Sequence, residues 1–326
     1  MTTGDAPPSL HVDARDIPVP AFLSPEAQAV LGMGSLGEAG YPALDDLDGW
    51  RAMIEARDAM VLAMLEPRAS LVEATDVVSD LDGVKAFLIT PKGTPEDDPR
   101  VCLEIHGGGL IMGGGACCRA MGITSAAVAG ARTWAIDYRM PPDHPYPAAL
   151  DDCLAAYRAL LRDHAAENII VRGGSAGGNL AAALILRARD EDLPLPAAAV
   201  LMTPEVDLTE SGDSFQANLG VDTVLTGSLM PANLLYAGGH DLAHPYLSPL
   251  FGDFTEGFPP TFLTTGTRDL FLSNTVRMHR ALRGAGIAAE LHVLEAAPHG
   301  GFFGTAPEDK ALVQEMRRFS DSHLAG

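Results

Sequence analysis

Short apolar segments alternate with helical segments from about residue 70 to the end of the chain. Their length and apolar character favour buried strands. Strands that alternate with helices predict an α/β fold, in which a mostly parallel central sheet is flanked by helices on both faces. The predicted strands cover residues 71–78, 84–90, 101–105, 133–136, 169–171, 198–202, 261–265 and 290–294.

Two parts of the chain depart from this alternation and suggest a cap. Residues 1–68 are predicted to form an extended, proline-rich arm followed by cap helices, the better of which covers 47–65. Residues 69–326 are predicted to form the main domain, with a cap insertion at about 207–250. An insertion of this length usually has a function, here that of covering a substrate. Further helices are predicted at 148–164, 176–189, 273–283 and 307–323.

The charge balance excludes several classes of partner. The chain has 43 acidic and 22 basic residues, a net charge of −21, which opposes binding to nucleic acids and to anionic membranes. Its four cysteines lack the spacing of a zinc site or a disulfide framework, so we expect no metal and no cofactor. No signal peptide or membrane span is recognisable, which predicts a cytoplasmic protein, and the sequence is compatible with a homodimer.

Ser175 lies between Gly173 and Gly177, at the junction of a predicted strand and a predicted helix. Small neighbours allow the sharp turn that exposes a nucleophilic serine at the end of a strand. The five-residue pattern is weak evidence alone, because a glycine-rich chain can produce it in any turn. Its value therefore depends on finding the partners of a nucleophile.

A second glycine-rich loop, His106-Gly107-Gly108-Gly109, follows the strand predicted at 101–105. Backbone N–H groups in such a loop can point at the oxyanion of a tetrahedral intermediate without obstruction by side chains. Together with the N–H group of Ala176, this loop is predicted to form an oxyanion hole. A phosphate-binding loop is not favoured, because the Lys-Ser/Thr ending is missing.

A serine nucleophile needs a histidine to take its proton and a carboxylate to orient that histidine. In this type of fold the chain order is serine, acid, histidine. Asp269 and His299 each follow a predicted strand and are predicted to fill these roles. Asp207 and Asp222, in the cap segment, are weaker alternatives for the acid. The remaining histidines after the serine are predicted to be surface or packing residues: His240, His244, His279, His292 and His323.

On these motifs the chain resembles the hormone-sensitive-lipase-like group of α/β-hydrolases, also called bacterial family IV esterases. The resemblance runs from about residue 70 to the C-terminus and includes the loop at 106–109, the proline-rich segment at 138–149 and the serine motif at 173–178. It implies an α/β-hydrolase fold and a Ser-His-Asp carboxylesterase whose N-terminal cap helps to form the substrate pocket. It also implies that Gly108, Gly109 and Ala176 donate to the oxyanion, that Gly107 holds the turn, and that His106 tethers the loop.

Four positions differ from the usual family pattern. Gly174 stands where Asp or Thr usually precedes the serine, and Ser273 replaces the second Asp of the acid loop. Glu205 stands at the Trp position of a segment that usually reads Ser-Pro-Trp-x-Asp-Leu. Glu104 occupies a position that is usually apolar or aromatic. We expect both glutamates to lie near the nucleophile strand, with pKa values raised by burial.

The sequence thus predicts a serine carboxylesterase for small esters of short to medium chain length. A lactonase or amidase would use the same triad, and a non-catalytic binding protein of the same fold is a further alternative. Met230, Leu234, Leu235 and Tyr236 are predicted to contribute an apolar pocket wall, although apolar residues at helical spacing more often belong to a core.

Overall fold

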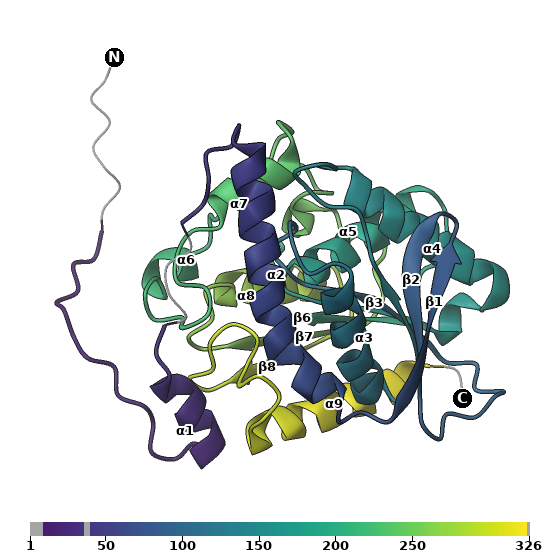
Figure 1. Cartoon of the computed structure of the whole chain (residues 1–326), viewed down its shortest axis with the longest axis horizontal. Coiled ribbons are helices and arrows are strands. Elements are labelled where there is room, and N and C mark those ends of the chain that lie inside the picture. Colours follow the sequence, from purple (N-terminus) through teal and green to yellow (C-terminus); the bar gives the residue numbers. More distant parts are fainter. Residues whose placement is uncertain (1–8, 36–39, 325–326) are drawn as a thin grey trace.

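The structure is a computed structural model that describes residues 9–35 and 40–324 (Figure 1). An eight-stranded sheet has the order β1-β2-β4-β3-β5-β6-β7-β8. β2 runs antiparallel to β1 and β4, and all other neighbours are parallel, which confirms the predicted mostly parallel sheet. The strands are β1 Ala74–Leu81, β2 Val84–Pro91, β3 Val101–Ile105, β4 Arg132–Ile136, β5 Ile169–Gly174, β6 Ala198–Met202, β7 Thr261–Gly266 and β8 Ala289–Leu294.

Helices cover both faces of the sheet (Figure 1). The predicted helices are present with small shifts at their ends, whereas α3 was not predicted. The α-helices are α1 Pro25–Gly32, α2 Leu47–Ala69, α3 Ala116–Ala129, α4 Ala148–Asp163, α5 Ala176–Asp190, α6 Ser214–Ala217, α7 Met230–Ala237, α8 Leu272–Gly284 and α9 Pro307–His323, and the 3₁₀ helices are η1 Ala166–Asn168 and η2 Pro249–Phe251.

The two faces of the sheet are buried against different helices. In β5, Ile169 and Val171 belong to the large core that contains α4 and α5, whereas Ile170 belongs to a core with Phe319 of α9. Successive side chains of a strand point to opposite faces, so a strand covered on both sides is continuously apolar. This burial explains why the central strands are short apolar runs without alternation.

The first strand begins later than predicted. The antiparallel register is set at the turn formed by Asp82 and Gly83, where Leu81 pairs with Val84. In this register the last pair is Ala74 with Pro91, so β1 starts at Ala74. Both turn residues have positive φ, 55° and 87°, as a two-residue hairpin turn requires. Leu71 is 83% exposed and lies outside the strand, so its apolar character misled the prediction.

The start of α2 packs against the insertion that contains α7. Trp50 of α2 is fully buried in a small apolar cluster, called here the cap cluster, which joins the N-terminal region, the segment after the second glycine loop, and α7. The predicted division into arm, cap and main domain stays a prediction, and part of the predicted arm lies outside the described residues. Among helices in the described ranges, none is long and apolar enough to span a bilayer. The members of the cap cluster are Tyr41, Trp50, Met53, Ile54, Ile111, Met112, Ala232 and Leu235.

Candidate active site

Ser175 occupies the turn between β5 and α5. Its backbone has φ 56° and ψ −124°, a conformation that costs energy for a residue with a side chain. The turn is held because the Ser175 N–H donates to the carbonyl of Met202 on the neighbouring strand (2.8 Å). Strain at a turn between a strand and a helix is the geometry of a nucleophile elbow.

The glycines around this turn differ in how much space they have. A Cβ on Gly177 would lie 1.9 Å from the carbonyl oxygen of Ile105, and one on Gly173 would lie 2.3 Å from the carbonyl oxygen of Gly177. By contrast, a Cβ on Gly174 would meet only ordinary contacts, the nearest being Met202 Cε at 3.7 Å. Close packing therefore requires glycine at 173 and 177 but not at 174.

This difference predicts opposite results for two alanine substitutions. Gly177→Ala should lower the free energy of unfolding by about 3 kcal/mol or more, because the backbone of β3 must move. Gly174→Ala should raise it by about 0.4–1 kcal/mol, because the unfolded chain loses freedom and the native backbone accepts the methyl group. Denaturant unfolding followed by circular dichroism measures both, and equal effects of the two substitutions would contradict the packing argument.

Asp269 and His299 lie together at the carboxyl ends of β7 and β8. The carboxylate oxygen Oδ1 of Asp269 accepts a hydrogen bond from His299 Nδ1 (3.1 Å). The same carboxylate accepts from the Thr265 hydroxyl (2.8 Å) and from the Phe271 N–H (2.8 Å), and it is completely buried. These bonds fix the position of the carboxylate. Because Asp269 then holds the proton on Nδ1 of the imidazole, Nε2 is the basic nitrogen.

Asp222 holds the acid loop and the histidine loop in place, a role that the sequence did not reveal. Its Oδ2 accepts from the Leu270 N–H (2.8 Å), and its Oδ1 accepts from the N–H groups of Val224 (2.9 Å) and His299 (3.3 Å). Sequence reasoning considered Asp222 only as an alternative acid, because nothing in a pattern shows which backbone groups a distant carboxylate will meet. Asp207, the other alternative, binds Arg277 instead (2.7 Å).

Glu205 connects the serine turn with the histidine. Its N–H donates to the Ser175 carbonyl (3.2 Å), while its side chain is completely buried and neither carboxyl oxygen has a hydrogen-bond partner in the described ranges. Burial raises the pKa of Glu205 to about 8; Glu210 and Asp207 add to the rise, and His299 opposes it. The expected raised pKa is thus confirmed, and the group is mostly protonated at neutral pH.

Three carboxyl groups surround His299 and affect its protonation. Burial by itself lowers the pKa of the imidazole, but Asp269, followed by Asp222 and Glu205, outweighs this effect and holds the pKa above its ordinary value of 6.5. Burial also raises the pKa of Asp222. The imidazolium form of His299 is therefore stabilised, as a general base requires after it has taken a proton.

Glu104 lies on β3, which pairs with the nucleophile strand β5, and Arg172 is the register partner of Glu104 on that strand. Its carboxylate contacts Arg172 Nε (2.9 Å) and accepts a hydrogen bond from Ser125. Burial raises the pKa of Glu104, as expected, while Arg172 opposes the rise. This glutamate has its own countercharge in Arg172, whereas the positively charged group that lowers the pKa of Glu205 is His299.

The second glycine loop lies directly beside the serine. A Cβ on Gly107 would be 3.4 Å from Ser175 Cβ. Gly108 and Gly109 have φ of 133° and 60°, which turns the loop sharply after β3. No group in residues 9–35 and 40–324 accepts a hydrogen bond from the N–H groups of Gly107, Gly108, Gly109 or Ala176. The three predicted donors, Gly108, Gly109 and Ala176, therefore have no competing acceptor in the described part of the chain.

The four predicted pocket residues do not share one environment. Leu235 belongs to the cap cluster, which also contains Ile111 and Met112 immediately after the second glycine loop. Met230 begins α7 and is partly buried, Leu234 is 41% exposed, and Tyr236 is completely buried in the large core. The structure thus brings Leu235 close to the glycine loop and places Tyr236 in packing rather than in a wall.

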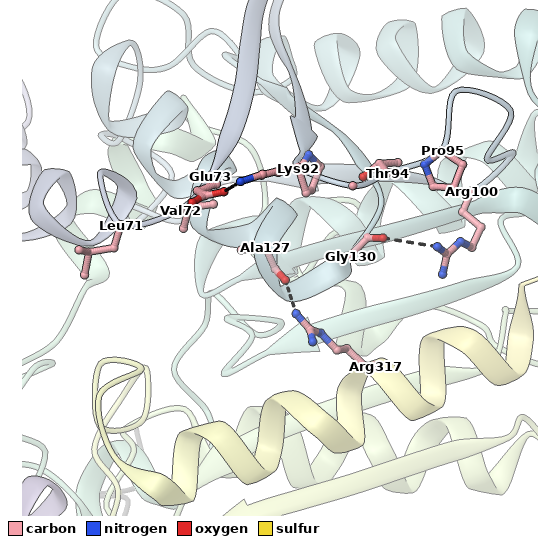
Figure 2. Close-up of a pocket in the computed structure, with 12 residues that line it drawn as sticks. Leu71, Val72, Glu73, Lys92, Thr94, Pro95, Arg100, Ala127, Gly130 and Arg317 are labelled. Carbon is pink, nitrogen blue, oxygen red and sulfur yellow. Dashed lines mark hydrogen bonds and ion pairs between the residues drawn. The ribbon is translucent and has the colours of Figure 1, made fainter.

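A surface cavity of about 540 Å³ lies near the amino-terminal ends of β3 and β4, at the opposite end of these strands from the glycine loops. Figure 2 shows that its charged side chains already have partners: Lys92 pairs with Glu73, and Arg317 donates to the Ala127 carbonyl. In a parallel sheet, ligands bind at the carboxyl ends of the strands, so this cavity is separate from the candidate site.

Comparison with known proteins assigns the chain to a group of hydrolases. Residues 102–303 match the sequence profile of a family described as alpha/beta hydrolase fold. An acetyl-hydrolase of Streptomyces hygroscopicus is 36% identical over 191 residues, which are 58% of this chain and 64% of that hydrolase. The chain thus spans slightly less than two thirds of that relative.

Solved structures of esterases match the fold of this protein over nearly its whole chain. One esterase has a TM-score of 0.87 at 35% identity, and the match covers 97% of this chain and 99% of the esterase. An esterase from the bacterial hormone-sensitive lipase family has a TM-score of 0.77 at 29% identity, covering 93% and 99%. The similarity includes the N-terminal region as well as the sheet.

Proposed function

The chain belongs to the α/β-hydrolase fold family, and from this premise we propose that it is a carboxylesterase that cleaves short- to medium-chain esters through an acyl-enzyme. The observation that carries the proposal is the buried Asp269–His299 hydrogen bond of 3.1 Å, which lies at the same edge of the parallel sheet as the elbow that holds Ser175. The second glycine loop lies against this elbow, where a Cβ on Gly107 would be 3.4 Å from Ser175 Cβ. This combination supports acyl transfer to a serine.

In the proposed first half-reaction, Ser175 Oγ attacks the ester carbonyl carbon while His299 Nε2 takes the hydroxyl proton. Asp269 holds the proton on Nδ1 and stabilises the imidazolium that forms. Gly108, Gly109 and Ala176 donate N–H groups to the oxyanion, and Gly107 keeps the loop against the elbow. Collapse of the intermediate breaks the ester C–O bond, and His299 gives its proton to the departing alkoxide.

In the second half-reaction, His299 Nε2 takes a proton from water, whose oxygen attacks the acyl carbon. The bond to Ser175 Oγ then breaks, the serine recovers the proton from His299, and the carboxylic acid leaves. Acylation and deacylation use the same N–H donors, because both pass through a tetrahedral oxyanion.

A substrate panel with covalent labelling tests this function. p-Nitrophenyl esters from acetyl to decanoyl should be hydrolysed, with the shorter acyl chains preferred over decanoyl. An organophosphonate should modify Ser175 alone, as located by peptide mass spectrometry. Turnover of lactones or anilides without turnover of esters would favour the lactonase or amidase alternative, and labelling of another residue would refute the nucleophile.

The acidic limb of the pH–kcat/KM profile should depend on Glu205. His299 acts as a base only when neutral, so activity should rise with pH through a raised histidine pKa. Glu205 is mostly protonated in this range and is charged in only a minority of molecules, so Glu205→Gln, which removes the smallest of the three contributions that raise the histidine pKa, should move the acidic limb only slightly to lower pH. The substitution leaves the other two carboxyl groups beside His299, Asp269 and Asp222, unchanged, and the titratable groups that interact with Glu205 itself include Glu210, Asp207 and Tyr41.

Glu104→Gln is the matched control for this experiment. It removes a second buried carboxyl group, but one that is neutralised by Arg172 and does not act on His299. Its acidic limb should coincide with that of the parent protein. If Glu205→Gln leaves the limb unchanged or moves it to higher pH, Glu205 does not influence the base.

A further inference from the structure

Three side chains that ester hydrolysis does not use come together behind the second glycine loop. His106 ends β3, Cys118 lies in α3, and Asp137 follows β4. One ligand atom from each lies within 4.8 Å of the other two. His106 and Cys118 are almost completely buried, and the side chain of Asp137, only 13% exposed, forms the edge toward solvent.

The hydrogen bonds of His106 determine which of its nitrogens is free. Nδ1 lies 2.9 Å from the Gly107 carbonyl oxygen, which can only accept, so Nδ1 carries the proton. Nε2 then presents a lone pair, and this buried atom has no partner in the described part of the chain. A histidine that ligates a metal usually donates its other N–H to a carbonyl or carboxylate in this way.

The other two residues are held by few bonds. The Cys118 thiol donates to the Ile136 carbonyl at 3.4 Å, and a thiol is a weak hydrogen-bond donor. The Asp137 carboxylate accepts from the Gly115 N–H (2.8 Å) and from Lys85 Nζ (2.8 Å). Each carboxylate oxygen has further lone pairs, and the half-exposed Lys85 can turn toward solvent.

We propose that His106, Cys118 and Asp137 form a binding site for a divalent transition metal ion of the zinc type. Imidazole nitrogen, thiolate sulfur and carboxylate oxygen are the ligands that zinc takes in proteins. Binding forms a metal–sulfur bond and releases the thiol proton to solvent, so that the thiolate and carboxylate together balance the two charges of the ion.

The spacing fits such an ion after a small contraction. At the centre of an equilateral triangle with sides of 4.8 Å, an ion would lie about 2.8 Å from each atom, against about 2.0–2.3 Å in zinc sites. Shifts of about 0.5 Å for the sulfur atom and about 0.8 Å for the nitrogen and oxygen atoms close the difference. Because His106 stacks on Tyr138 at 4.1 Å and its carbonyl accepts from the Tyr138 hydroxyl (2.8 Å), the ion would fasten the glycine loop to this layer.

The experiment uses cobalt as a spectroscopic probe on full-length, chelator-treated protein. Cobalt bound to a thiolate absorbs in the near ultraviolet, and titration should reach one equivalent per chain. Cys118→Ser should lose this band, whereas Cys117→Ser, which changes the adjacent buried thiol, should keep it. Without metal, both variants should hydrolyse p-nitrophenyl acetate as the parent protein does, which verifies their fold independently of the metal.

Absence of the band in the parent protein, its persistence in Cys118→Ser, or its loss in a folded Cys117→Ser would each overturn the proposal. If Cys118→Ser does not fold, X-ray absorption on the zinc-loaded parent protein decides. One sulfur at about 2.3 Å with nitrogen and oxygen at about 2.0 Å is expected, and a shell without sulfur would refute the site.

Discussion

Ser175→Ala is expected to lower kcat for p-nitrophenyl ester hydrolysis by about 10⁶-fold, the loss typical of removing a serine nucleophile from a triad. The residual rate should come from the oxyanion donors and from substrate binding, which the substitution leaves in place. Because alanine fits the elbow as a smaller side chain, the loss should appear in kcat with little change in thermal unfolding. The burst of p-nitrophenol and the organophosphonate adduct should both disappear.

Gly174→Ala is the matched control, since it adds a methyl group one residue before the nucleophile, where only ordinary contacts await it. It should retain kcat within about tenfold, because the catalytic groups keep their positions. Ester hydrolysis at the parent rate by purified Ser175→Ala would refute the mechanism. A severe loss in Gly174→Ala would show that substitutions at the elbow act through geometry rather than through the hydroxyl.

Asp269→Ala is expected to lower kcat by about 10⁴-fold, less than loss of the serine, because the histidine remains and can still act as a weaker base. The substitution removes the acceptor of the Nδ1 hydrogen bond and the largest contribution that raises the histidine pKa. Burial then dominates, so the acidic limb of the pH–rate profile should also move to lower pH. Steady-state kinetics between pH 5 and about 9 measure both effects, a range that includes the ordinary histidine pKa.

Asp207→Asn separates this effect from a general loss of structure. Asp207 is equally buried but directs its carboxylate to Arg277, Thr209 and Ser211, away from His299. Asp207→Asn should lower the free energy of unfolding, because the ion pair with Arg277 is weakened. At temperatures where the protein is folded, it should leave kcat and the acidic limb nearly unchanged. If Asp269→Ala retains activity and Asp207→Asn loses it, Asp207 rather than Asp269 is the acid of the triad.

Local patterns predicted much of the fold because the central strands β3, β5, β6 and β7 are buried on both faces and are therefore mostly apolar runs. They failed for α3, whose segment contains cysteines, β-branched residues and Gly122, all of lower helix propensity than alanine, and has no side-chain cap at its start. They also misplaced the start of β1, where only the pairing of Leu81 with Val84 decides the register. α3 packs against α2 and β4, and β1 pairs with β2, and a local window contains neither of these contacts.

The sequence by itself determined the sheet class, the elbow glycines and the candidate serine, acid and histidine, because these depend on residue type, chain order and position at strand ends. Only the tertiary structure decided which groups surround them: Asp222 between the two loops, a protonated Glu205 beneath the site, and the His106–Cys118–Asp137 cluster behind it. Hydrogen-bond partners, burial and pKa depend on side chains from distant segments, and these meet only when the sheet has formed.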